Sequence, residues 1–79
     1  MEDSKHFEDM LNERGIKKEW ADRTTNEPDR TEDHEDGTRH FMKRIPEFGN
    51  RHLRVIVNVS VKPEKRITVF FDRRLRRGP

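Results

Sequence analysis

Hydrophobic and polar residues alternate most regularly over residues 52–61, which read HLRVIVNVSV. Successive side chains of an extended strand point to opposite faces, so this segment predicts a strand with two different faces. The first face is wholly apolar and comprises Leu53, Val55, Val57, Val59 and Val61. The second face is mixed and comprises Arg54, Ile56, Asn58 and Ser60. The first set predicts a core, and the central question is whether the second set faces water, a partner or a substrate.

Two further segments alternate in the same way and predict strands over residues 38–45 and 66–72. Pro46, Gly49 and Asn50 predict a turn after the first of them, and the stretch KPEK at 62–65 predicts another. Strands joined by such short turns pair antiparallel, so the three segments predict a β-meander.

The N-terminal part of the chain has helical spacing instead. Phe7, Met10, Leu11 and Arg14 form one helical stripe, with Asp3 and Ser4 as candidate N-caps and Gly15 as a stop. A first helix is therefore expected over residues 4–14. Ile16, Trp20 and Thr24 recur every four residues, and Pro28 follows. A second helix is expected over 17–25, ending before that proline.

Residues 29–37, DRTEDHEDG, are polar throughout and are interpreted as either a loop or a weak edge strand that ends at a Gly37 turn. The predicted fold class is α+β: one domain, 1–79, with two N-terminal helices packed on one face of a three- or four-stranded antiparallel meander. Residues 73–79 form a basic tail. The face under the helices is expected to comprise Val55, Val57, Val59, Ile67, Val69 and Phe71.

The composition supports one small core. Of the 22 apolar residues, 14 lie between Phe41 and Phe71, although 43% of the chain is charged. The chain contains no cysteine, which excludes disulfides and thiolate sites. Its start is acidic and polar, unlike a signal peptide, and its longest apolar run is three residues, too short to span a membrane. A cytoplasmic protein is expected.

The net charge of +2 hides an asymmetry along the chain. Residues 1–36 carry 13 acidic and 6 basic groups, whereas residues 37–79 carry 12 basic and 3 acidic groups. A charge-rich surface that keeps a small protein soluble is one explanation. The other is a basic sheet face that attracts a polyanion, with an acidic helical half turned away from it.

The face opposite the core is expected to carry His40, Met42, Arg44, Arg54, Ile56, Asn58, Thr68 and Phe70. Apolar side chains on such a face are usually shielded from water by another molecule or another segment of the chain. A homodimer partner or a curled C-terminal tail would shield them here. The functional alternative is a nucleic-acid platform, because arginine binds phosphate bidentately and aromatic rings stack on unpaired bases. The candidate nucleic-acid-binding residues are Arg39, His40, Arg44, Arg54 and Phe70.

Several short motifs resemble a family of small prokaryotic proteins known as a domain of unknown function. They are His6-Phe7, ERGI at 13–16, DGTR at 36–39, LRVIV at 53–57 and ITVFFD at 67–72. The positions that match the family pattern are His6, Arg14, Arg39, Arg54 and Thr68. The chain departs from the pattern at Met10, where the family has an arginine nearby, and at Phe70 and Phe71, where a tyrosine is common.

That family is distantly similar to RelE/ParE-type toxins and to metal-independent ribonucleases of the barnase and colicin group. The resemblance implies a RelE-like fold and an action on RNA, with an antitoxin-like protein as a further partner. Cleavage of RNA without a metal needs a base for the 2′-hydroxyl, an acid for the leaving 5′-oxygen, and cations that stabilise the charge on the phosphate. The candidate catalytic residues are His6 as acid or base, Arg54 as phosphate clamp and Thr68 as hydrogen-bond donor, with His40 in reserve.

Simpler roles compete with these assignments. His6 can shield the edge of the first helix, Arg54 can pair with an acid of the N-terminal half, and Thr68 suits a strand by propensity. A non-enzymatic module that binds nucleic acid or protein, or that forms a dimer, is the alternative function. The four histidines lack metal-ligand spacing, and no phosphate loop or dinucleotide fingerprint occurs, so no metal and no cofactor is expected.

Overall fold

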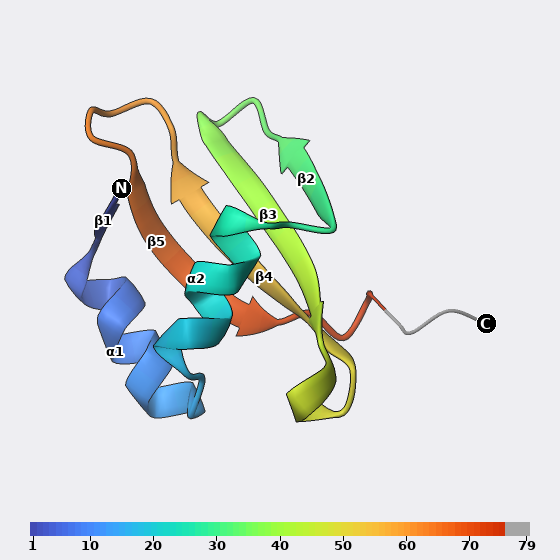
Figure 1. Ribbon diagram of the computed structural model, residues 1–79. Coiled ribbons are helices and arrows are strands. Elements are labelled where there is room, and N and C mark those ends of the chain that lie inside the picture. Colours follow the sequence, from blue (N-terminus) through green and yellow to red (C-terminus); the bar gives the residue numbers. More distant parts are fainter. Residues whose placement is uncertain (76–79) are drawn as a thin grey trace.

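The computed structural model describes residues 1–75 and consists of one sheet with two helices on one of its faces (Figure 1). The helices are α1 (Lys5–Arg14) and α2 (Lys18–Asn26). The strands are β1 (Glu2–Asp3), β2 (Arg30–Asp33), β3 (Thr38–Ile45), β4 (Arg51–Asn58) and β5 (Lys65–Phe71). A 3-10 turn, η1 (Pro46–Phe48), joins β3 to β4. The α+β class, with two N-terminal helices packed on one sheet face, is confirmed.

The sheet has five strands in the order β1-β5-β4-β3-β2, one more than the three or four predicted. Strands β2 to β5 form the expected antiparallel meander, and the polar segment at 29–37 does contribute an edge strand. The additional strand, β1, pairs parallel to β5 and makes the sheet mixed. Asp3 therefore belongs to a strand, and its carboxylate holds the Arg66 guanidinium at 2.5 and 2.8 Å.

Local signals account for both helices. The Ser4 side chain accepts the Phe7 N–H at 3.0 Å and caps α1, so the helix proper begins at Lys5. Gly15 ends α1 in the left-handed conformation, with φ 63°, which glycine adopts without steric penalty. The second helix, α2, ends at Asn26, two residues before Pro28.

The core lies between the helices and the sheet. Phe7, Ala21, Leu53, Val55, Val57 and Val69 have no exposed area, and Trp20, Met10 and Leu11 are nearly as buried. Packing of the helical stripe on the valine face of β4 is confirmed. Because the core is this small, each of its members contributes a large share of the burial.

Two parts of the predicted core face are wrong. A β-bulge shifts the register of β4 against β5, so Val57 pairs with Arg66 and Ile67 is left between ladder positions, only half-buried. The strand predicted to end at residue 61 ends at Asn58, because the Asn58 side chain accepts the Ser60 N–H and turns the chain. Val59 still packs against the core, as predicted, whereas Val61 is 40% exposed. In the basic tail, residues 76–79 lie outside the described residues.

The bulge can be tested by stability. Leu53→Ala should lower the free energy of unfolding by about 3 kcal/mol, because it empties a fully buried site. Ile67→Ala, which the simple alternation would rank equally, should lower it by about 1 kcal/mol or less. Urea unfolding of the two variants beside the wild type measures both values, and equal losses would contradict the described register.

Candidate functional site

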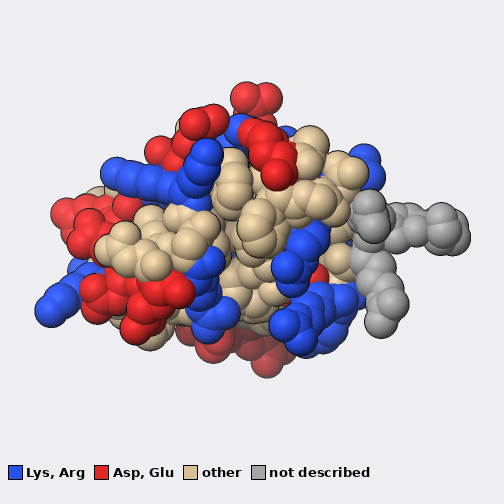
Figure 2. Space-filling model, turned by 90° about the horizontal axis from the view of Figure 1, so that it is seen from below, with Lys and Arg blue, Asp and Glu red and all other residues tan. Residues whose placement is uncertain are grey.

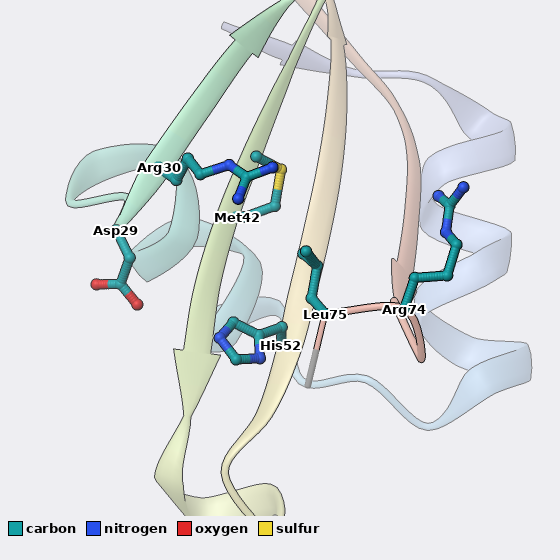
Figure 3. Close-up of a pocket in the computed structure, with 6 residues that line it drawn as sticks. All are labelled: Asp29, Arg30, Met42, His52, Arg74 and Leu75. Carbon is teal, nitrogen blue, oxygen red and sulfur yellow. The ribbon is translucent and has the colours of Figure 1, made fainter. Parts of the chain in front are cut away.

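The sheet face away from the helices carries a polar network, and we call it the open face. Cross-strand pairs place Arg30, Met42, Arg54 and Phe70 in one row, and Glu32, His40, Ile56 and Thr68 in the next. Figure 3 looks onto this face, with the helices behind the sheet. Unlike the valine face, it combines ionised groups, imidazoles and half-buried apolar side chains.

Arg54 is the centre of this network, at 6% exposure. Its Nε donates to Asp72 Oδ2 at 2.8 Å, and its Nη1 lies 2.8 Å from His40 Nδ1 and 3.5 Å from Glu32 Oε1. A buried guanidinium needs a counter-ion and hydrogen-bond acceptors, and these three groups provide them. The partners come from β2, β3 and the residue after β5, so Arg54 joins all four strands of the meander.

The contact with Arg54 fixes the protonation of His40. A guanidinium has no acceptor, so Arg54 donates and His40 Nδ1 accepts, which leaves the ring proton on Nε2. Burial, together with the nearby His34 and Arg54, lowers the pKa of His40 below its usual value. His34 also stacks on His40, with ring centroids 3.8 Å apart. The open face therefore presents a neutral imidazole beside a buried cation.

The carboxylates of the open face lie beneath their arginine partners. Hydrogen bonds from Arg74, with the Arg54 contact, lower the pKa of Asp72 to about 2, and the Arg30 contact lowers that of Glu32 to about 2. The Asp72 side chain is 2% exposed, whereas that of Arg74 is 80% exposed. The Glu32 side chain is 33% exposed and that of Arg30 is 58% exposed. Solvent therefore meets mainly the guanidinium groups.

A pocket of about 470 Å³ opens on this face beside Arg54 (Figure 3). Its walls are Asp29, Arg30, Met42, His52, Arg74 and Leu75. Met42, predicted as an exposed residue of the second face, is only 1% exposed. The chain after β5 turns back across the open face and supplies Arg74 and Leu75, so part of the C-terminal tail provides the cover that the sequence suggested as one alternative.

The structure brings together most of the candidate residues, but not all of them. Arg54, Thr68, Phe70, His40 and the exposed Arg44 share the open face. His6 is an exposed residue of α1, in the helical layer, so the sheet lies between it and Arg54. Arg39 pairs across the sheet with the core residue Val57, on the helix side, and its Nε contacts Asp33 at 2.6 Å.

Several members of the network were missed from the sequence, namely Arg30, Glu32, His34, His52, Asp72 and Arg74. A usable signal exists for three of them: Arg30, Glu32 and His34 alternate, as the residues of one strand face do. Taking 29–37 definitely as a strand would have placed them beside Met42 and His40. Nothing local marks His52 or Asp72.

The acidic and basic halves of the chain do not form opposite faces. Ion pairs join the halves, for example Arg54 with Glu32, Arg66 with Asp22 and Glu47 with Arg23. Figure 2 shows Lys and Arg side chains interspersed with Asp and Glu on the surface seen from below. The expected acidic half turned away from a basic face is therefore wrong, and positive charge is concentrated only locally.

Within residues 1–75, no cluster of three or more histidine and carboxylate side chains has the geometry to hold a metal ion. The helices of this part of the chain are too short and too polar to cross a membrane.

The buried ion pair predicts a pH dependence of stability. The pKa of Asp72 falls from 3.8 to about 2 on folding, so the ionised carboxylate stabilises the fold above about pH 4, and this stabilisation is lost as the pH falls towards 2. Asp72→Asn leaves Arg54 without its nearest counter-ion and should lower the unfolding free energy at pH 7 by about 3 kcal/mol. The difference from wild type should shrink by about 2 kcal/mol between pH 5 and pH 2.

Urea unfolding at a series of pH values measures this difference. Asp33→Asn is the matched control, because Asp33 is 73% exposed in its pair with Arg39, and its loss should change stability at pH 7 by less than about 1 kcal/mol. A difference between Asp72→Asn and wild type that stays constant across the pH series would show that Asp72 does not stabilise through its charge.

Comparison with known proteins gives a family. The family model described as Domain of unknown function (DUF4258) matches residues 4–71, which include both helices and strands β2 to β5. No curated protein and no solved structure matches the chain. Because the family model covers most of the sequence and all but the first strand of the fold, the chain belongs to the DUF4258 family of domains of unknown function.

Proposed function

We propose that this domain binds single-stranded RNA on the open face of its sheet. The observation that carries the proposal is the arrangement of Arg30, Arg54 and Arg74 on a face that neither helix covers. Three guanidinium groups share two carboxylates there, and Arg44 adds an exposed fourth. With Asp29 in the pocket wall as a third carboxylate, four arginines face three acids, so the local balance is positive.

The chemistry of the face suits RNA better than a simple anion. Guanidinium groups bind phosphate oxygens in pairs, and their geometry is fixed here by the carboxylates beneath them. Half-buried Ile56, Thr68 and Phe70 lie in the neighbouring positions of β4 and β5. Unpaired bases stack on such aromatic and apolar side chains, and hydroxyls hydrogen-bond their edges. The distant similarity of the family to RelE/ParE-type toxins, noted from the sequence, points to the same class of partner.

One observation favours a second candidate, cleavage of the bound RNA without a metal. His40 is neutral and touches Arg54, so a base and a phosphate clamp lie side by side. If the Arg54 Nη1 turns from His40 Nδ1 to a phosphate oxygen, Nδ1 becomes free to accept the 2′-hydroxyl proton as the 2′-oxygen bonds to phosphorus. The bond from phosphorus to the 5′-oxygen then breaks, and the leaving 5′-oxygen takes a proton from water. Thr68 shares a row with His40, one strand beyond Ile56. His6 has no part in this arrangement, because the sheet separates it from Arg54.

The binding proposal predicts a charge effect specific to one face. The double variant Arg30→Gln, Arg44→Gln should weaken binding of a fluorescent single-stranded RNA by about tenfold or more, and should reduce the slope of log affinity against log salt by about 1.4, the value for two phosphate contacts. Fluorescence anisotropy at 50 to 200 mM salt measures both quantities.

The control removes the same charge from the helical layer, where Arg14 and Lys18 are exposed. Arg14→Gln, Lys18→Gln should bind like the wild type. Equal weakening in both double variants would mean that only net charge matters and would overturn the assignment to the open face. Absence of RNA binding, together with a concentration-dependent dimer in sedimentation, would favour a protein partner for this face instead.

The cleavage candidate predicts a different pair of results. Wild-type protein incubated with RNA in EDTA should cut it, and His40→Ala should lower the rate at least 100-fold, the usual contribution of a general base. His6→Ala should cut at the wild-type rate. Gel analysis of end-labelled RNA measures the rates. No cleavage by the wild type removes the catalytic version and leaves the binding proposal intact, whereas a loss confined to His6→Ala would contradict the open face as the reactive surface.

A further inference from the structure

The pocket beside Arg54 has two chemically different sides. Met42 and Leu75 provide apolar surface, and Arg30 and Arg74 provide guanidinium groups. In Figure 3 the Arg30 side chain reaches from β2 across β3 to Met42, so a cationic group lies at the edge of the apolar surface. Asp29 points away from Met42 in the same view, and its carboxylate is bonded to the Arg44 N–H at 2.9 Å.

Both arginines of the pocket keep unused hydrogen-bond donors. Arg30 contacts Glu32 through Nη2, and Arg74 contacts Asp72 through Nε and Nη2. The Arg30–Glu32 pair is 58% and 33% exposed, so it is of the weak, solvated kind that an incoming anion can replace. The Arg74 side chain is 80% exposed, but its partner Asp72 is 2% exposed. In Figure 3 the Arg74 side chain points away from Arg30, so the two guanidinium groups do not converge on one anion. A phosphate group is the anion that the Arg30 guanidinium fits best.

The third wall carries an unsatisfied polar atom. His52 Nδ1 has almost no exposed area and no hydrogen-bond partner, and it is the one such side-chain atom in residues 1–75. Buried polar atoms are almost always hydrogen-bonded, so a hydrogen-bond partner is expected for His52 Nδ1. His52 lines the pocket, so a turn of its ring towards the pocket would bring this atom within reach of a ligand that enters beside Leu75 and carries a polar edge.

A planar group with a polar edge and an attached phosphate meets all three requirements. We infer that the pocket binds one nucleoside monophosphate unit, with its base against Met42 and Leu75, a base edge towards His52, and its phosphate at Arg30, whose guanidinium group lies at Met42 (Figure 3). A pocket of about 470 Å³ is within the range that holds small organic ligands. The inference deepens the proposed function and rests on it when the unit is part of an RNA, although a free nucleotide has the same chemistry.

The experiment uses NMR titration of the full chain with four probes: the common ribonucleoside 5′-monophosphates, the corresponding nucleosides, ribose 5-phosphate and inorganic phosphate. Nucleoside monophosphates should bind at least fivefold more tightly than ribose 5-phosphate, and their addition should shift the His52 ring and Met42 methyl signals. Leu75→Ala should remove most of this preference for the base and leave affinity for ribose 5-phosphate unchanged. Arg30→Gln should weaken both.

The matched control is Val61→Ala, which shortens an exposed aliphatic side chain outside the pocket and should behave like the wild type. Thermal unfolding of each variant shows that it is folded, and Arg30→Gln, on an exposed side chain, gives a second test if Leu75→Ala is unstable. Equal affinity for nucleotides and ribose 5-phosphate, or shifts elsewhere on the surface, would overturn the base pocket.

The two proposals fail separately. RNA binding that Arg30→Gln, Arg44→Gln weakens and Leu75→Ala does not would leave the open face as an RNA surface and remove the pocket. Nucleotide binding sensitive to Leu75→Ala without any RNA binding would support the pocket as a site for free nucleotides and remove the proposed RNA function.

Discussion

The burial of Arg54 is the constraint on which the open face depends. A guanidinium at 6% exposure is destabilising unless its charge and donors are satisfied, and Asp72, His40 and Glu32 satisfy them from three other parts of the sheet. The contacts of Arg54 thus hold the polar side chains of the open face in place, as the packing of the valines holds the core together. It also explains why the chain turns back after β5, since Asp72 is the closest counter-ion and anchors the segment that carries Arg74 and Leu75.

A second arginine is buried on the helix side of the sheet, and carboxylates neutralise its charge as well. Arg66 is 6% exposed, lies 4.7 Å from the Phe7 ring and pairs with Asp3 and Asp22. Two of the acids that the buried arginines engage, Asp3 and Asp22, thus lie in the N-terminal half, as Glu32 does on the open face. The unequal charges along the sequence are therefore used to hold the two halves together, which is why they do not become two oppositely charged surfaces.

Alternation and helical spacing were sufficient to predict α1, α2 and the β3 to β5 meander, because those patterns depend on neighbours in the chain. They could not predict β1, whose two residues have no pattern and pair with residues more than 60 positions away. The bulge at Ile67 lies next to buried Arg66, whose partners Asp3 and Asp22 are distant in the sequence, so no local pattern marks it. His6 and Arg54 were combined by residue type and by their match to the family motifs, and only the layer order shows that the sheet separates them.

A face whose arginines are already paired can still bind a polyanion, because its ion pairs differ in strength. The Arg30–Glu32 pair is accessible to solvent on both sides, and such pairs contribute only about 0 to 1 kcal/mol, so phosphate can take the place of Glu32 at little cost. Arg74 is 80% exposed and can contact a phosphate with its free donors while it stays paired with the buried Asp72. The pair between Arg54 and Asp72 is buried on both sides, and breaking it is expensive. The Arg54–Asp72 pair therefore fixes the geometry of the open face while Arg30 and Arg74 contact the phosphate. In this way a small domain has a rigid binding surface without a third structural layer behind it.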